Sequence, residues 1–154
     1  MGGLRLFKML KGPWESRNSS VELDMRIYFA HALCTYGYPI EKAERKQIRN
    51  SFPRCKIIDP GSYEGNPEKS LKGMNFCYEL IDTCDMLVFS RLLGKVTSGV
   101  GVEIRYALSK SIRVYELHSK SVKSIKKPVR YLSREKTRHL FRVWRRENTC
   151  RTHH

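Results

Sequence analysis

Short apolar runs alternate with helical apolar spacings along the middle of this chain of 154 residues. The run Met-Leu-Val-Phe-Ser at 86–90 is apolar up to its serine, as is typical of a buried parallel strand. The segments between the runs place apolar residues three and four positions apart, which forms one face of a helix. The pattern predicts strands at 26–30, 56–58, 86–90, 112–117 and 129–132, helices at 39–52, 71–81 and 100–108, and a last helix capped by Ser133.

Strands that alternate with helices are the signature of a parallel sheet with helices on both faces. We therefore expect an α/β fold of the flavodoxin or Rossmann-like type, with four to five strands and an added basic C-terminal helix. Ligands of such folds bind at the carboxyl ends of the strands. These ends correspond to the loops at 31–37, 59–68 and 90–103.

The composition, with 40% hydrophobic and 10% aromatic residues, fits one folded domain. Residues 1–24 lack periodicity and predict a loose extension, residues 25–118 hold the α/β domain, and residues 119–154 hold a basic linker and the last helix. No apolar run approaches the roughly 20 residues that span a bilayer, and the start lacks the apolar core of a signal peptide. We therefore expect a cytoplasmic protein without a membrane partner.

The net charge of +15 is concentrated at the C-terminal end. Residues 119–154 contain 12 basic and 2 acidic residues, a net charge of +10. Two interpretations of this tail stay open. Its clustered cations could bind nucleic acid by releasing phosphate counterions. Alternatively, a helix could pack Leu140, Phe141 and Trp144 against the domain or a second subunit and leave its cations in solvent.

The loop after the third expected strand holds the most informative residues. Gly99 and Gly101 lie at the turn from strand to helix, where glycine lets the backbone approach a ligand closely. Ser98, just before them, could contact a phosphate or cap the helix. Glu103 is expected in the first helical turn, where the helix dipole would favour its ionised form and keep it usable as a nucleophile. An acidic residue at such a place is also common for stability alone, so the pattern leaves both interpretations open.

Three segments in the same order carry a family resemblance: Arg-Ile-Tyr-Phe-Ala at 26–30, Leu-Ile-Asp-Thr-Cys-Asp-Met-Leu-Val at 80–88, and Gly-Val-Gly-Val-Glu-Ile-Arg-Tyr-Ala-Leu at 99–108. With these segments the stretch 25–117 resembles the nucleoside 2-deoxyribosyltransferase family and its nucleotide N-glycosidase relatives. The resemblance implies cleavage or transfer of the N-glycosidic bond of a 2-deoxyribonucleoside or its 5′-monophosphate.

The resemblance also implies roles for particular residues. In the family the glutamate of this turn attacks the anomeric carbon and expels the base, and water or a second base then takes the sugar. Carried over, Glu103 is the expected nucleophile and Tyr28 the tyrosine that helps to position it. The expected ligand is a small nucleoside or nucleotide, with no cofactor and no metal. A homo-oligomer is also expected, because relatives often complete the site from a neighbouring subunit.

Two positions depart from the family pattern. The first loop has a single glycine, Gly37, where relatives that take 5′-phosphates have several, so His31 is either a substitute substrate contact or a structural hydrogen bonder. Cys77 stands at the position of a family carboxylate, and Asp82 is the nearby residue that we name for that role. Asp59, in the second loop, is a further candidate for a ligand contact.

Two other functions stay open at this point. The fold could serve as a nucleotide- or nucleic-acid-binding module without turnover, which would use the basic tail for binding. A glutamate at a ribose carbon could also cleave nicotinamide dinucleotides.

Overall fold

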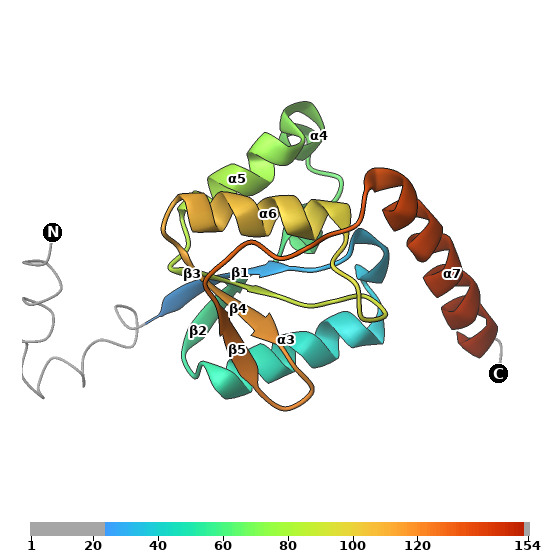
Figure 1. Ribbon diagram of the computed structural model, residues 1–154, viewed down its shortest axis with the longest axis horizontal. Coiled ribbons are helices and arrows are strands. Elements are labelled where there is room, and N and C mark those ends of the chain that lie inside the picture. Colours follow the sequence, from blue (N-terminus) through green and yellow to red (C-terminus); the bar gives the residue numbers. More distant parts are fainter. Residues whose placement is uncertain (1–23, 153–154) are drawn as a thin grey trace, which may run out of the picture.

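The computed structural model describes residues 24–152, in which five strands form one sheet in the order β2-β1-β3-β4-β5 (Figure 1). The expected α/β architecture is thereby confirmed, and the order matches the flavodoxin-like arrangement. Four strands run parallel and the last pairs antiparallel with its neighbour. They are β1 (Met25–Ala30), β2 (Cys55–Ile58), β3 (Met86–Phe89), β4 (Arg113–Leu117) and β5 (Val122–Ile125).

Helices cover both faces of the sheet. One face packs against α3 (Pro39–Ser51), and the other packs against α5 (Met74–Asp82) and α6 (Ser98–Ser109) (Figure 1). The alternation of β1 explains this arrangement, since Ile27 and Phe29 face the α3 side whereas Tyr28 and Ala30 face the other side. The remaining helical segments are α4 (Pro67–Lys72), the 3-10 turns η1 (Leu33–Thr35) and η2 (Pro60–Tyr63), and α7 (Arg134–Thr152).

The helix expected at 71–81 is divided into two. Gly73 separates α4 from α5 and has a φ of 57°, which glycine adopts without steric cost. None of the helices in the described range combines the length and the apolar character that crossing a membrane would need. The expected extension falls almost entirely on residues 1–23, which lie outside the described residues.

The prediction of a fifth strand at 129–132 was wrong. The fifth strand is β5, within the segment expected to be linker, and its pairing with β4 makes it an edge strand. Val129 and Tyr131 instead pack on the cluster beneath α6, and the Leu132 amide donates to the Val96 carbonyl at 2.9 Å. The apolar residues of this segment therefore cover a helix and do not pair in the sheet.

The last helix, α7, packs on the domain as one of the two tail interpretations predicted. The Lys136 amide donates to the Ser133 hydroxyl at 3.1 Å, which confirms the expected cap. Trp144 is only 5% exposed and packs with Leu140 and Phe141 against the segment after β1 and against Leu92. Figure 1 shows α7 beyond the end of the sheet toward which the parallel strands point. Nucleic-acid binding by this tail stays a prediction.

Candidate active site

A cavity of about 820 Å³ lies at the carboxyl ends of β1 and β3. Its walls come from the segment after β1, from α4 and α5, from the first half of α6, and from α7. The sheet order changes direction between β1 and β3, and such a switch point is where ligands bind in open α/β sheets. The volume is within the range of small-molecule sites.

Glu103 is a buried carboxylate in the wall of this cavity, with 6% of its surface exposed. Tyr28 on β1 donates its hydroxyl proton to Glu103 Oε2, across 75 positions of sequence. Burial raises the pKa of the Glu103 carboxyl to about 7, against the opposing influence of hydrogen bonds from Tyr28 and Cys77 and of the Lys69 charge. Glu103 therefore changes its charge near neutral pH.

This result corrects the expectation that the helix dipole would keep Glu103 ionised. The helix α6 begins at Ser98, so Glu103 is its sixth residue and lies beyond the first turn. The dipole effect falls off within the first turn, whereas desolvation acts on the whole buried side chain. Burial therefore outweighs the dipole, and the carboxyl holds its proton more tightly than an exposed glutamate.

Tyr28 and Cys77 both donate hydrogen bonds to Glu103. Burial, reinforced by the charges of Glu103 and Cys77, raises the pKa of Tyr28 well above its ordinary value, so the hydroxyl keeps the proton that it donates. Burial and the Glu103 charge raise the pKa of the Cys77 thiol to about 11. Cys77 lines the cavity at the position where we expected a family carboxylate. Glu103 is thus the one carboxylate in the wall of this cavity among residues 24–152.

His31 lines the same cavity but is already engaged on both ring nitrogens. Its Nε2 lies 2.8 Å from Asp59 Oδ1, and its Nδ1 lies 3.1 Å from the Thr35 hydroxyl. That hydroxyl donates to the Ala32 carbonyl at 2.8 Å, so it accepts from His31 Nδ1. Both ring nitrogens of His31 therefore have hydrogen-bond partners within the protein. The structural role considered for His31 is therefore visible, and a substrate contact through its exposed edge stays a prediction.

Asp59 is the carboxylate that holds the His31 ring in place. Burial alone would raise the pKa of its carboxyl, but hydrogen bonds from His31 and the Gly61 amide, together with the Arg45 charge, lower the pKa below its ordinary value. Asp59 is 4% exposed and does not line the cavity. It therefore supports His31 from outside the cavity.

His31, Glu41 and Asp59 could together offer three ligand atoms to a metal ion, since these atoms lie within 4.8 Å of one another. The two carboxylates already face cations, however. Arg45 Nη1 lies 3.2 Å from Asp59 and 3.7 Å from Glu41, and His31 Nε2 lies 3.4 Å from Glu41 Oε2. A metal ion would have to break the contact between His31 and Asp59 and sit beside the Arg45 guanidinium. The donor set therefore fits an internal ion-pair cluster better than a metal site.

The remaining candidates divide into residues in the cavity and residues outside it. Ser98 and Gly99 line the cavity, and Ser98 is half-buried. Gly101 does not, because it is buried under the Tyr131 ring, where an added Cβ would overlap the ring. Asp82 is exposed at the end of α5 and accepts a hydrogen bond from the Tyr106 hydroxyl at 2.8 Å. Asp82 and Gly101 therefore lie outside the lining of the cavity.

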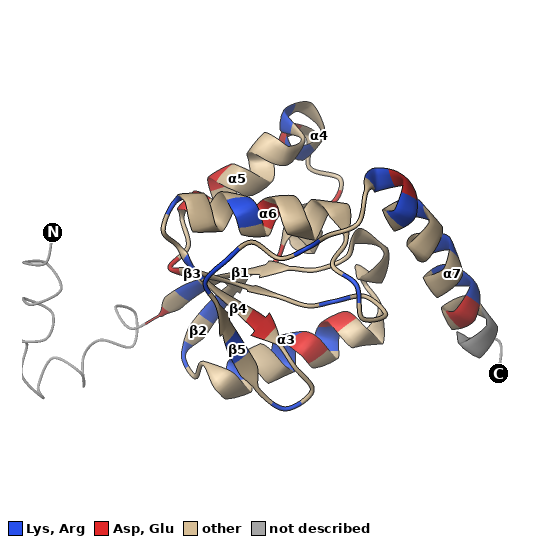
Figure 2. Cartoon of the chain, viewed as in Figure 1, with Lys and Arg blue, Asp and Glu red and all other residues tan. Residues whose placement is uncertain are grey.

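The structure also adds residues that the sequence did not single out for this site. Lys69 on α4 and two arginines of α7, Arg134 and Arg138, line the cavity. Figure 2 shows basic residues along much of α7, including its first turn. The only signal in the sequence was the spacing of Arg134 and Arg138, four apart on one helix face. That spacing does not tell which partner the face meets.

A scan against protein-family models, a search of curated proteins and a search of solved structures each found no match for this chain.

Proposed function

We propose that this protein cleaves the N-glycosidic bond of a 2-deoxyribonucleoside or of its 5′-monophosphate, with Glu103 as the nucleophile. One observation carries the proposal. Glu103 is a buried carboxylate in the wall of a ligand-sized cavity, held at one oxygen by the Tyr28 hydroxyl. The likeness of 25–117 to nucleoside 2-deoxyribosyltransferases supports the choice of reaction.

The chemistry follows from this arrangement. Tyr28 holds Oε2, and in the proposed reaction the other oxygen of Glu103 attacks the anomeric carbon. A carbon–oxygen bond forms as the carbon–nitrogen bond breaks, and the electron pair leaves with the base, which takes a proton from solvent. Water then attacks the same carbon, gives up a proton and releases the sugar, and the Glu103 carboxylate is restored. An oxocarbenium-like transition state is stabilised by the adjacent anion.

The pKa of Glu103 sets the pH dependence of this reaction. Only the ionised carboxylate is a nucleophile, and burial raises the pKa of Glu103 to about 7. The rate is therefore expected to rise with pH through about 7 and to level off above it.

The test uses chromatography to measure the base that is released from the four common 2-deoxyribonucleosides and from their 5′-monophosphates. Wild-type protein is expected to release base, and Glu103→Ala and Glu103→Gln are expected to lower kcat by about 1,000-fold or more. A deoxyribosyl adduct on Glu103 is expected in the intact-protein mass spectrum of a quenched reaction.

The matched control is Glu44→Gln on α3. Burial also raises the pKa of Glu44 to about 7, but its carboxylate accepts from Ser90 and does not line the cavity. This variant is expected to retain turnover. Absence of base release by the wild type, or equal release by the Glu103 variants, would refute the proposed function.

A further inference from the structure

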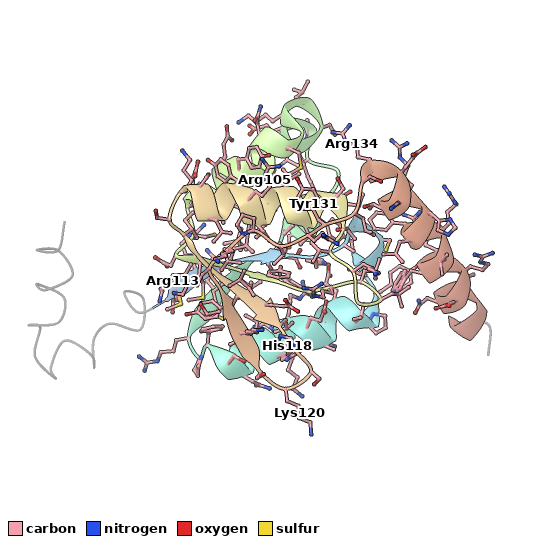
Figure 3. All side chains as sticks on the ribbon, viewed as in Figure 1. Arg105, Arg113, His118, Lys120, Tyr131 and Arg134 are labelled. Carbon is pink, nitrogen blue, oxygen red and sulfur yellow. The ribbon has the colours of Figure 1, made fainter. Side chains whose placement is uncertain are left out.

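The first two turns of α7 form one wall of the cavity. Arg134, Thr137 and Arg138 line it, and the Thr137 hydroxyl accepts a hydrogen bond of 2.9 Å from the Ser98 amide. This bond ties α7 to the first turn of α6, five residues before Glu103. Figure 3 shows Arg134 at the start of α7, on the side that faces α4 and α6. The buried Trp144 fixes the same helix two turns further on.

The lysine and arginine residues that line the cavity outnumber its carboxylates. Lys69, Arg134 and Arg138 line it, and Glu103 is their one acidic counterpart among the described residues. Lys69 is engaged by Glu64 and by the Pro60 carbonyl. A concave surface lined by one sign of charge raises the local concentration of ions of the opposite sign.

In the described part of the chain, Arg134 and Arg138 differ from Lys69 in having no such partners. Within residues 24–152 neither guanidinium takes part in an ion pair or a hydrogen bond. Their positions four apart place both on one face of α7, where they can hold a single group between them.

Helix stability does not account for Arg134. It is the first residue of α7, where the positive end of the helix dipole disfavours a cation. A solvated basic face would tolerate arginine better toward the C-terminal end. The helix dipole therefore gives no reason for an arginine at this position, which lies in the cavity wall.

We propose that Arg134 and Arg138 form a phosphate subsite, which makes the substrate a 2-deoxyribonucleoside 5′-monophosphate and not the free nucleoside. This inference rests on the proposed function for the part of the ligand at Glu103. Phosphorylation of the 5′ hydroxyl is what gives a nucleoside a dianionic group, and guanidinium groups bind phosphate in a bidentate manner. The subsite comes from α7, which lies outside the segment 25–117 that resembles the family, whereas the loop after β1 holds a single glycine, Gly37.

The experiment compares kcat/KM for each deoxynucleoside and its 5′-monophosphate in wild type, Arg134→Ala, Arg138→Ala and Arg138→Lys. The wild type is expected to prefer the monophosphate. The ratio of kcat/KM for the monophosphate to kcat/KM for the nucleoside is expected to fall by about 10-fold to 100-fold in each alanine variant. It is expected to fall by less in the lysine variant. Arg146→Ala, an exposed arginine of α7 outside the cavity wall, is the matched control and is expected to keep the wild-type ratio.

A binding experiment tests this inference separately from the proposed function. Equilibrium dialysis measures how tightly the same ligands bind to Glu103→Gln protein with and without each arginine substitution. Inorganic phosphate is added as a competitor. Tighter binding of the monophosphate than of the nucleoside, lost in the alanine variants, would support the phosphate subsite even where no turnover is found.

Two outcomes overturn the inference. In the first, base is released but the ratio is unchanged by Arg134→Ala and Arg138→Ala, which refutes the subsite and leaves the proposed function intact. In the second, monophosphate and nucleoside bind the Glu103→Gln protein equally well. Circular dichroism and urea unfolding of each variant show whether the fold is kept, and the lysine variant repeats the test with a smaller change.

Discussion

Replacement of Glu103 by glutamine is expected to stabilise the protein, increasingly so as the pH rises. Burial raises the pKa of Glu103 from an ordinary 4.5 to about 7, so the folded protein binds this proton more tightly than the unfolded chain. The carboxyl's contribution to folding is therefore most favourable below pH 4.5 and is lost as the pH rises through 7. Glutamine has no such ionisation cost and can still accept the Tyr28 hydroxyl.

The size of the effect follows from the shift. About 2.5 pKa units between the folded and unfolded states correspond to about 3 kcal/mol at pH 8 and to about 1 kcal/mol at pH 5. The difference in unfolding free energy between Glu103→Gln and wild type should therefore grow by about 2–3 kcal/mol over this interval. That change is a large fraction of the stability of a typical domain.

The assay is urea unfolding of both proteins at pH 5, 6, 7 and 8, with the m value used to check that the transition stays two-state. Glu44→Gln serves as a comparison, because burial raises the pKa of Glu44 to about 7 as well and the same direction of change is expected. A Glu103→Gln difference that stays flat from pH 5 to pH 8 would refute the reasoning, since the carboxyl would then titrate alike in both states.

Two further predictions concern the surroundings of Glu103. Tyr28→Phe removes a hydrogen bond that lowers the pKa of Glu103, so the acid limb of the kcat/KM profile should move to higher pH; an unmoved limb would show that the hydroxyl does not hold the carboxylate. Gly101→Ala should destabilise the protein by about 1–3 kcal/mol because its methyl group would overlap Tyr131. Gly99→Ala is the matched control, since an added Cβ there meets no atom within 4 Å and the change should be neutral or slightly stabilising in urea unfolding. Equal stability of the two alanine variants would contradict the packing argument.

The parallel strands were predictable to within about a residue at each end. The strand predicted at 26–30 is β1 (Met25–Ala30), and the one predicted at 86–90 is β3 (Met86–Phe89). Both are short apolar runs, and a buried parallel strand needs little beyond such a run. The error at 129–132 has the same origin. Val129 and Tyr131 have strand-like character, but their apolar side chains are satisfied equally well by covering α6.

The location of the candidate site was also predictable, but its chemistry was not. Parallel strands bring their carboxyl ends to one edge, so the loop that holds Glu103 had to lie there. The partners of Glu103 come from β1, α4 and α5, and the direction of its pKa shift depends on how completely these elements exclude water. Local spacing predicted a carboxylate that the helix dipole keeps ionised, whereas burial raises its pKa to about 7.

The sequence by itself determined the alternating elements, the turn before Glu103 and an apolar stripe on the last helix. These are properties of neighbouring residues, because strand and helix periods are local. The tertiary structure decided that α7 forms one wall of the cavity, that Arg134 and Arg138 line it, and that Asp82 and Gly101 do not. Such placements depend on contacts between distant segments, of which the hydrogen bond from Ser98 to Thr137 is one, and no local pattern specifies them.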